Sequence, residues 1–352
     1  MSSSTRILTS ISILSSLALL VHLLTSCAPY IEPLVYRCLL PRSLTPQDTH
    51  TRFPLLDRLT CALAAFYTDA HASPLGLLSL QLILNVFVST VFLAHVEGSR
   101  RGAAWTLLAC TPLAGFICTA VGGIGVYVPL MLVPLLIHHK ATIESSPRAN
   151  AVPLPRVYAL LVALVINVAI QILAFVYPHD ASFLGRAVAG QVLYSHLAWF
   201  LYTPLTVVFE KAILALVLTE QQQDLRARQV LLRVFYLLAG LNAGVHVASV
   251  LAFWHSGTST RQVAQVFGYQ FRAEHAEAAS AYYLLWDMVG AAWGSLLWIV
   301  ADAGSWWAAV LILALAPVVS PVAAMMVYAA RREDRFLERF STRRYDGKAK
   351  LQ

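Results

Sequence analysis

Apolar residues fill the chain in long runs that short polar stretches separate. A membrane core about 30 Å thick is crossed by roughly 20 apolar residues in a helix, and segments of this kind recur from end to end. None shows the short alternating pattern of a membrane β-barrel. The pattern therefore predicts helical spans near residues 7–26, 74–95, 103–121, 157–177, 187–209, 230–254, 280–300 and 306–330.

One apolar segment is short and interrupted by glycine and proline. Residues 122–137 read GGIGVYVPLMLVPLLI, which indicates either a further short span or a broken continuation of the preceding one. Backbone groups freed by glycine and proline are tolerated in a membrane where protein or a water-filled cavity covers them. We therefore predict an all-α, polytopic transmembrane bundle of seven to nine spans, with residues 1–330 forming a single domain.

Composition agrees with a membrane location. The chain has 352 residues, of which 58% are hydrophobic and 12% charged, against about 25% charged in soluble domains. The net charge of +7 is concentrated near the end, since Arg331–Lys350 carries eight of the 25 Lys and Arg residues. Residues 331–352 are thus predicted to be a basic cytoplasmic tail beside anionic lipid, with no nucleic acid as partner.

The first span and the following connection leave fewer signals. Residues 7–26 are longer than a typical secretory signal core, which favours a retained span. The proline-rich connection Pro29–Ser73 is predicted to be irregular, with a short interfacial helix over Leu55–Tyr67. The five cysteines show no C-x-x-C pair or zinc spacing, and Cys110 and Cys118 are expected to pack as small apolar residues.

Asp287 is an unusual residue because it lies inside the apolar run AYYLLWDMVGAAWGSLLWIVAD, residues 281–302. A charged carboxylate in hydrocarbon costs from about 2.5 kcal/mol upward, so such residues are rare without a function or a partner. Desolvation favours the neutral acid, which can donate a proton. The alternative is an aspartate that stabilises the bundle by hydrogen bonds to another helix.

Glu97 ends the second predicted span, and Arg100 follows three residues later on the same helical face. This spacing leaves two interpretations open, an ion pair that closes the helix and a catalytic carboxylate. Two other acids near apolar segments, Glu210 and Asp302, are expected to be solvated at span boundaries.

Aromatic residues are numerous around these acids. An apolar pocket lined by aromatic rings stabilises a positive charge without acting as a base, which suits a cationic cyclisation. No G-x-x-x-x-G-K-[ST], H-E-x-x-H or G-x-S-x-G motif occurs, and no paired aspartates suited to Mg²⁺ lie near a span, so neither a metal nor a cofactor is predicted. The predicted substrate-binding residues are Tyr283, Trp286, Trp293, Trp199, Tyr202 and Arg100.

Four stretches together resemble the fungal integral-membrane terpene cyclases of meroterpenoid and indole-diterpene pathways, in particular those of ascofuranone-type and paxilline-type clusters. They are DRLTCALAAFYTDAHASP (57–74), HVEGSRR (95–101), GIGVYVPL (123–130) and YYLLWD (282–287). The resemblance implies a metal-free enzyme that protonates an epoxide or alkene of a prenylated substrate and lets the cation close rings. It also implies two membrane-embedded acids, which Glu97 and Asp287 match.

The neighbouring cation on Arg100 favours the charged form of Glu97, so Asp287 is the expected proton donor and Glu97 an orienting group or base. The resemblance further implies an endoplasmic reticulum location, with a prenyltransferase and an epoxidase in the same membrane. Two other functions stay open. A proton-coupled carrier would use Asp287 and residues 122–137 along a pathway, and a non-catalytic scaffold would keep only the bundle.

Overall fold

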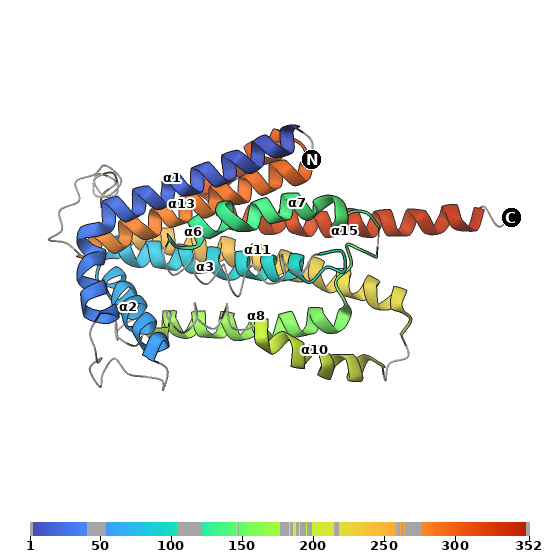
Figure 1. The fold of residues 1–352 in the computed structure, drawn as a ribbon, viewed down its shortest axis with the longest axis horizontal. Helices are drawn as coiled ribbons and strands as arrows, with labels where there is room; N and C mark the ends of the chain where they lie inside the picture. Colours follow the sequence, from blue (N-terminus) through green and yellow to red (C-terminus); the bar gives the residue numbers. More distant parts are fainter. Residues whose placement is uncertain are drawn as a thin grey trace.

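The computed structural model describes residues 3–40, 54–103, 122–146, 148–176, 199–214, 218–257 and 276–349, with a few isolated positions between them. All secondary structure in these ranges is helical (Figure 1). The helices are α1 (Ser3–Leu34), the π-helical turn η1 (Val35–Leu39), α2 (Pro54–His71), α3 (Pro74–Gly98), α6 (Ile124–Tyr127), the π-helical turn η3 (Val128–Leu132), α7 (Val133–Ile143), α8 (Leu154–Val176), α10 (Trp199–Leu214), α11 (Glu220–His255), α13 (Ala276–Ala303), α14 (Trp306–Val319) and α15 (Pro321–Ala349).

The prediction of an all-helical protein with apolar helices of membrane-spanning length is confirmed in the described ranges. Within the described ranges, five helices are long and apolar enough to cross a membrane: Ser4–Leu39, Pro74–Gly98, Ile124–Ile143, Glu220–His255 and Ala279–Ala303. The short segment that sequence left open is thus one continuous helical stretch, formed by α6, η3 and α7. The predicted span near 103–121 lies almost wholly outside the described residues, as does the first part of the span near 187–209.

The predicted single span near 306–330 differs in the structure. The segment divides into α14 and α15, and Ser320 between them has φ 84°, a left-handed conformation that ends one helix just before Pro321 begins the next. A continuous helix would separate residues 302 and 332 by roughly 45 Å. Arg332 Nε instead lies 2.9 Å from Asp302 Oδ1. Helices α14 and α15 therefore form a hairpin that returns to the end where α13 stops.

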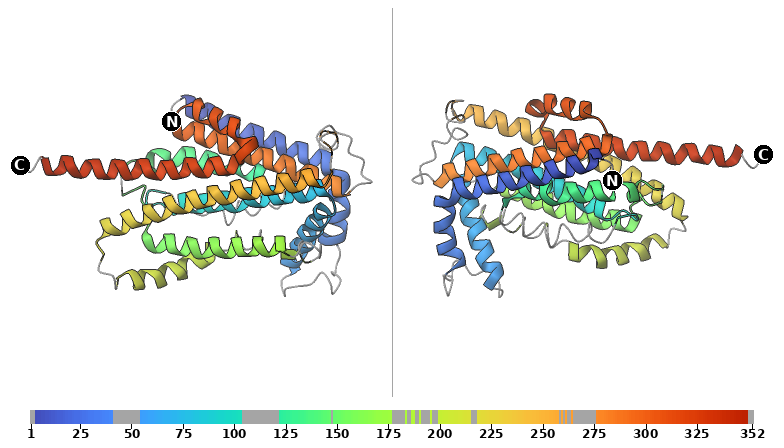
Figure 2. Two further views of the ribbon diagram at one scale, coloured as in Figure 1. Left: turned by 180° about the vertical axis from the view of Figure 1, so that it is seen from behind. Right: turned by 45° about the horizontal axis from the view of Figure 1, so that its top comes forward.

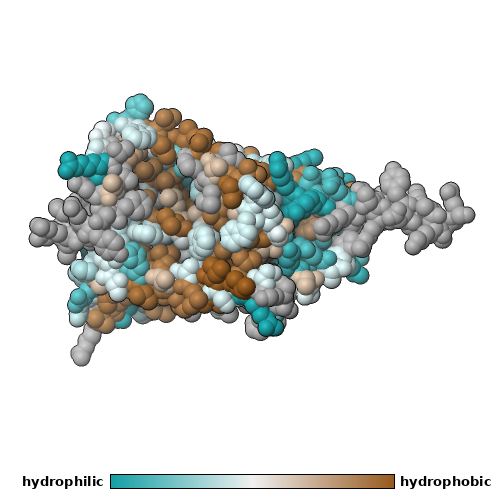
Figure 3. Space-filling model, turned by 90° about the horizontal axis from the view of Figure 1, so that it is seen from above, coloured by the Kyte–Doolittle hydropathy of each residue, from teal (hydrophilic) through white to brown (hydrophobic). Residues whose placement is uncertain are grey.

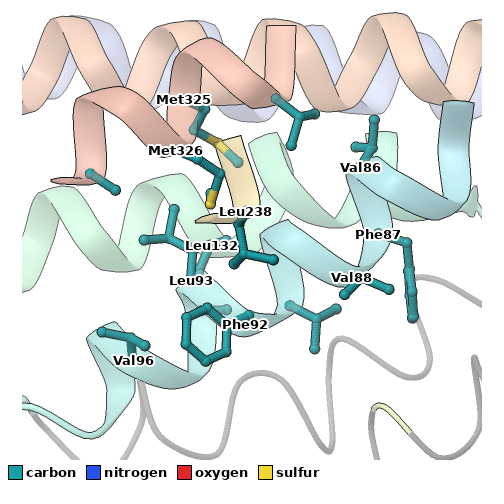
Figure 4. Packing of buried hydrophobic residues seen from close by; sticks show 14 of the residues in the cluster. Val86, Phe87, Val88, Phe92, Leu93, Val96, Leu132, Leu238, Met325 and Met326 are labelled. Carbon is teal, nitrogen blue, oxygen red and sulfur yellow. The ribbon is translucent and has the colours of Figure 1, made fainter. Parts of the chain in front are cut away.

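Helix α3 is the centre of the bundle. The side chain of Ser73, the residue before α3, accepts a hydrogen bond from the N–H of Gly76, and Pro74 occupies the first turn. The helix therefore begins at a defined residue. Apolar side chains along α3 pack against η3, α11 and α15 (Figure 4). The residues labelled there are Val86, Phe87, Val88, Phe92, Leu93 and Val96 of α3, with Leu132, Leu238, Met325 and Met326.

The two ends of the long axis have different structures. At one end the chain turns between α1 and α2, so η1 and α2 lie across the end of the bundle (Figures 1 and 2). Pro29 and Pro33 lie inside α1, which extends the first helix into the segment predicted to be irregular. Helix α2 contains the predicted interfacial helix Leu55–Tyr67. At the other end α15 projects beyond the bundle (Figure 1).

The surface agrees with a membrane location. On the face drawn in Figure 3, hydrophobic side chains gather between the two ends, and hydrophilic ones gather where α15 leaves the bundle. Large apolar side chains are exposed along the lipid-length helices, for example Leu14 (66%) and Val21 (60%) on α1 and Leu237 (72%) on α11. Exposed apolar side chains of this extent are expected where lipid, and not water, is the solvent.

Candidate functional site

Asp287 lies in the middle of α13, on the side that faces the bundle. Helix α13 packs against α1, α3 and α6, and these neighbours leave the Asp287 residue 4% exposed. Tyr283 and Gly290 lie about one helical turn away on the same face. The apolar run that sequence singled out therefore points its one internal carboxyl group into the protein.

The N-terminus of α6 faces this carboxyl group. Asp287 Oδ1 accepts a hydrogen bond of 2.5 Å from the N–H of Gly125, and the N–H of Ile124 is a second backbone donor to the side chain. The first N–H groups of a helix have no partner within it and carry partial positive charge. Asp287 satisfies these donors and thereby links α13 to the start of α6.

The glycine run at residues 122–125 makes this close approach feasible. Gly123 has φ 78°, which favours glycine, and a Cβ built there would overlap the Asp287 carboxyl group. A Cβ on Gly125 would overlap the backbone carbonyl of Asp287, and one on Gly290 would meet the backbone of Gly125. The interruption seen in the sequence is thus a place where two helices touch through their backbones.

A cavity of about 300 Å³ lies beside Asp287. This volume is at the lower end of the roughly 300–1,000 Å³ typical of ligand pockets. Apart from Asp287, the described lining carries no charged side chain, and its polar side chains are the hydroxyls of Tyr67 and Tyr283. The lining residues come from five parts of the fold: Leu24, Ile31 and Leu34 of α1; Val35 and Leu39 of η1; Ala62, Leu63, Phe66 and Tyr67 of α2; Ile83, Leu84 and Phe87 of α3; and Gly123, Ile124, Tyr283, Leu284 and Asp287 at the α6–α13 contact.

Aromatic rings form one wall of the cavity. Phe66 packs edge-on against Tyr283, with ring centroids 5.3 Å apart, and against Tyr67, with centroids 5.4 Å apart. Phe87 adds a fourth ring from α3. The structure therefore contains an apolar pocket with aromatic rings and one acid, as the sequence suggested. Most of the rings come from α2 and α3 and were not among the predicted binding residues.

The other predicted substrate-binding residues lie elsewhere. Trp286 packs against the ring of His22 on α1, with centroids 5.0 Å apart, and Trp293 Nε1 donates to Ser15 Oγ at 2.9 Å. Tyr202 is buried against His95, with centroids 4.9 Å apart. Trp199 begins α10, and its side chain is outside the described part of the chain. Of the predicted aromatic residues with described side chains, only Tyr283 lines the Asp287 cavity.

Glu97 belongs to a separate, charged cluster. Its Oε1 accepts from Arg100 Nη2 at 2.6 Å and from Arg332 Nη1 at 2.8 Å. Arg100 also pairs with Glu333, and Arg332 with Asp302. These side chains are at most 5% exposed, so α3, α13 and α15 meet through a nearly dry ionic network.

Aromatic and polar partners complete this network. The guanidinium groups of Arg100, Arg228 and Arg332 lie 5.1 to 5.6 Å from the ring centroid of Phe336. Burial opposes the charge on Arg100, but the carboxylates of Glu333 and Glu97 outweigh it and raise the pKa of this arginine. Burial also opposes the charge on Arg332, whose pKa is raised by Glu97 and Asp302. The neighbouring carboxylates therefore favour the charged form of both arginines.

The structure does not bring the two predicted acids together. Glu97 lines a space of about 10 Å³, shared with Lys140, Asp302 and Arg332, which holds at most one water molecule. Asp287 lines the large cavity, and neither acid lines the other's cavity. Arg100, also predicted to bind substrate, lies with Glu97. Asp302, expected to be solvated, has a side chain 5% exposed and accepts from Tyr328 at 2.6 Å.

A disulfide between Cys38 and Cys61 was not predicted from sequence. It joins η1 to α2, and the next residues along the chain, Leu39 and Ala62, line the Asp287 cavity. The two cysteines are 23 residues apart without a recognisable motif, and only their placement on crossing helices shows the pairing. Cys110 and Cys118 lie outside the described residues.

In its described ranges the chain is an all-helical protein with five helices of membrane-spanning length and a buried acid in an apolar cavity. The sequence profile of the CtvD domain matches residues 33–337, and the chain belongs to this family. Membership indicates a protein of secondary-metabolite gene clusters. No curated protein and no solved structure matches the chain. Within the described residues, no three His, Cys, Asp or Glu side chains are grouped as metal ligands.

Proposed function

We propose that this chain is a membrane-bound terpene cyclase that cyclises a prenylated meroterpenoid or indole-diterpene intermediate, with Asp287 as the proton donor. One observation carries the proposal: Asp287 is the single acid among the described residues of an apolar cavity whose wall includes four aromatic rings. Such a cavity binds hydrocarbon, excludes water and tolerates positive charge.

The proposed reaction is an isomerisation. The neutral carboxyl group of Asp287 transfers its proton to an epoxide oxygen or an alkene carbon of the substrate. For an epoxide, the C–O bond breaks as the oxygen becomes a hydroxyl, and a neighbouring alkene supplies the electron pair that forms the new ring bond. The cation that results loses a proton, so the product has the composition of the substrate and no cofactor is consumed.

The N-terminus of α6 can stabilise the Asp287 carboxylate that proton transfer leaves behind. After proton transfer the residue is a carboxylate in a dry cavity, which is costly without compensation. The N–H groups of Ile124 and Gly125 already point at its oxygen atoms, and donors placed in advance stabilise charge that develops during a reaction. The same carboxylate is also a base that can accept the proton released at the end.

The structure favours a different role for Glu97 than catalysis in this cavity. Two arginines hold its carboxylate away from the Asp287 cavity, and the space of about 10 Å³ that Glu97 lines is too small for a prenylated substrate. We propose that Glu97, with Arg100, stabilises the contact of α3 with α15.

The two ends of the molecule suggest an orientation. Disulfides persist in oxidising compartments such as the lumen of the endoplasmic reticulum, and basic segments stay on the cytoplasmic side. The elements η1 and α2, which the Cys38–Cys61 disulfide joins, lie at one end of the long axis, and the basic α15 leaves at the other (Figure 1). We propose an endoplasmic reticulum location, with the C-terminus in the cytoplasm and the Asp287 cavity toward the lumen.

Product analysis tests the proposed function. Membranes that contain the chain are incubated with a farnesylated or geranylgeranylated aromatic epoxide, and the extract is compared with that of membranes without it. We expect a cyclic product of the same mass as the substrate. An unchanged substrate that moves across sealed vesicles would instead favour the carrier hypothesis.

A further inference from the structure

The residues that line the Asp287 cavity are buried on one side and partly exposed to the surface on the other. The residues contributed by α3 and α6, together with Asp287 and Leu284 of α13, are buried. The residues contributed by α1 and η1 are half-buried or exposed, and Leu24 is 41% exposed while it lines the cavity. The wall formed by α1 and η1 is therefore the side of the cavity that lies closest to the surface.

The rim on this side is apolar. Its α1 and η1 members are Leu24, Ile31, Leu34, Val35 and Leu39, all of them aliphatic. The opposite rim on α2 consists of half-buried Ala62, Leu63 and Phe66. Charged side chains are mostly found where water solvates them. None of the described lining residues on these three elements is charged.

The rim also continues a surface that faces lipid. Leu14, Leu17, Val21 and Leu24 are exposed along α1, which has the length and hydropathy of a membrane span. Further along, Glu32 and Arg37 are exposed beside the last rim residues. Charged side chains are placed where a helix leaves the hydrocarbon for the headgroup region. We therefore infer that Leu24 lies at acyl-chain depth and Leu39 near the headgroups.

We propose that the gap between α1–η1 and α2 is a lateral opening that admits an amphiphile from the bilayer. An apolar chain enters the cavity toward Asp287 while a polar group stays near Glu32 and Arg37. The Cys38–Cys61 disulfide joins the two rims at the headgroup end and limits their separation there. The identity of the substrate, a prenyl chain carrying a polar aromatic group, rests on the proposed function. The route from the bilayer does not depend on it.

Spin labels test the route without any catalysis. A nitroxide is attached to cysteine introduced at Leu24 or Leu34 in the chain reconstituted in liposomes, with the unsubstituted chain as background. We expect collisions with lipid-soluble oxygen to exceed those with a water-soluble nickel chelate. A fully saturated farnesylated phenol, which cannot cyclise, should lower oxygen access at both positions but not at Val21, an exposed α1 residue outside the cavity.

Substitutions that narrow the opening provide a second test. Leu24→Trp and Leu34→Trp should raise the KM for the membrane-dissolved epoxide about tenfold with little change in kcat, whereas Val21→Trp should leave both unchanged. Greater access of the nickel chelate at Leu24 and Leu34, or no protection by the saturated phenol, would overturn the lateral opening. Lipid access and protection without any cyclic product would keep the opening and reject the proposed cyclase.

Discussion

Asp287 and the glycines of residues 122–125 define the site at the scale of single residues. The carboxyl group occupies the space that a Cβ at Gly123 would need, and it receives N–H donors from the start of α6. A side chain can be held in one orientation when backbone groups bind it and neighbours leave no alternative space. This cradle explains how an acid is kept in place within a wall of hydrocarbon.

Gly123→Ala should destabilise the protein more than Gly257→Ala does, because it adds a steric overlap to the cost of a positive φ. Gly257 offers a matched control because its φ is 76°, close to the 78° of Gly123, and a Cβ there meets nothing within 4 Å. The positive φ should cost each alanine variant about 1–3 kcal/mol. Overlap with Asp287 should cost Gly123→Ala about 1–3 kcal/mol more. Unfolding in detergent would measure both, and equal losses would contradict the cradle.

Glu97→Gln should reduce stability and leave chemistry intact. The substitution removes a carboxylate that neutralises Arg100 and Arg332 in a buried network, which should lower the free energy of unfolding by about 3 kcal/mol. Glu220→Gln is the control, since its pairs with Arg101 and Arg148 involve a side chain 53% exposed and should contribute about 0–1 kcal/mol. Turnover per folded molecule should equal wild type. A stable but inactive Glu97→Gln variant would restore the catalytic role.

At the scale of helices, α2 and η1 determine the shape of the cavity. They cross the end of the bundle, supply six of the 17 lining residues, and are joined by the Cys38–Cys61 disulfide. The half-buried positions of this rim have fewer packing partners than the α3 wall. Their arrangement therefore depends on the covalent link more than that of the central helices does.

Reduction of the disulfide should destabilise the protein. For a loop of this size, loss of the link costs about 3 kcal/mol. We expect dithiothreitol to lower the melting temperature of the wild-type chain and of Cys27→Ser, a variant at the buried free cysteine of α1. The double variant Cys38→Ser, Cys61→Ser should melt at the lower temperature with or without dithiothreitol. A wild-type melting temperature that reductant leaves unchanged would argue against the link.

Sequence periodicity predicted the helices well where a lipid-length apolar run forms one straight element. It did not predict the α14–α15 hairpin, because hydropathy is the same on both sides of Ser320 and the reversal depends on backbone conformation. It identified Asp287 as unusual but not its partners. Contacts between helices depend on which faces pack together, and the spacing of Glu97 and Asp287 along the chain carries no such information.

At the scale of the whole molecule, the charged network and the apolar cavity involve different elements. The ionic network of Glu97, Arg100, Arg332 and Glu333 joins the C-terminal end of α3 to α15. The Asp287 cavity is lined in part by η1 and α2, and these two elements lie at the opposite end of the long axis from the projecting α15 (Figure 1). The first should stabilise the bundle near the cytoplasmic surface. The second should receive a lipid-soluble substrate.

The central claim is that Asp287 supplies the proton, and Asp287→Asn tests it most directly. Asparagine keeps the size of the side chain and an oxygen that accepts from Gly125 N–H, but it has no acidic proton. Asp69→Asn is the control. Asp69 is an α2 residue that accepts a hydrogen bond of 2.7 Å from the hydroxyl of Tyr30 and does not line the cavity.

Cyclic product formed per bound prenylated epoxide should be measured in membranes for both variants. We expect Asp287→Asn to bind the saturated phenol normally and to form product at least about 100-fold more slowly, and Asp69→Asn to resemble wild type. Wild-type product formation by Asp287→Asn would contradict the account.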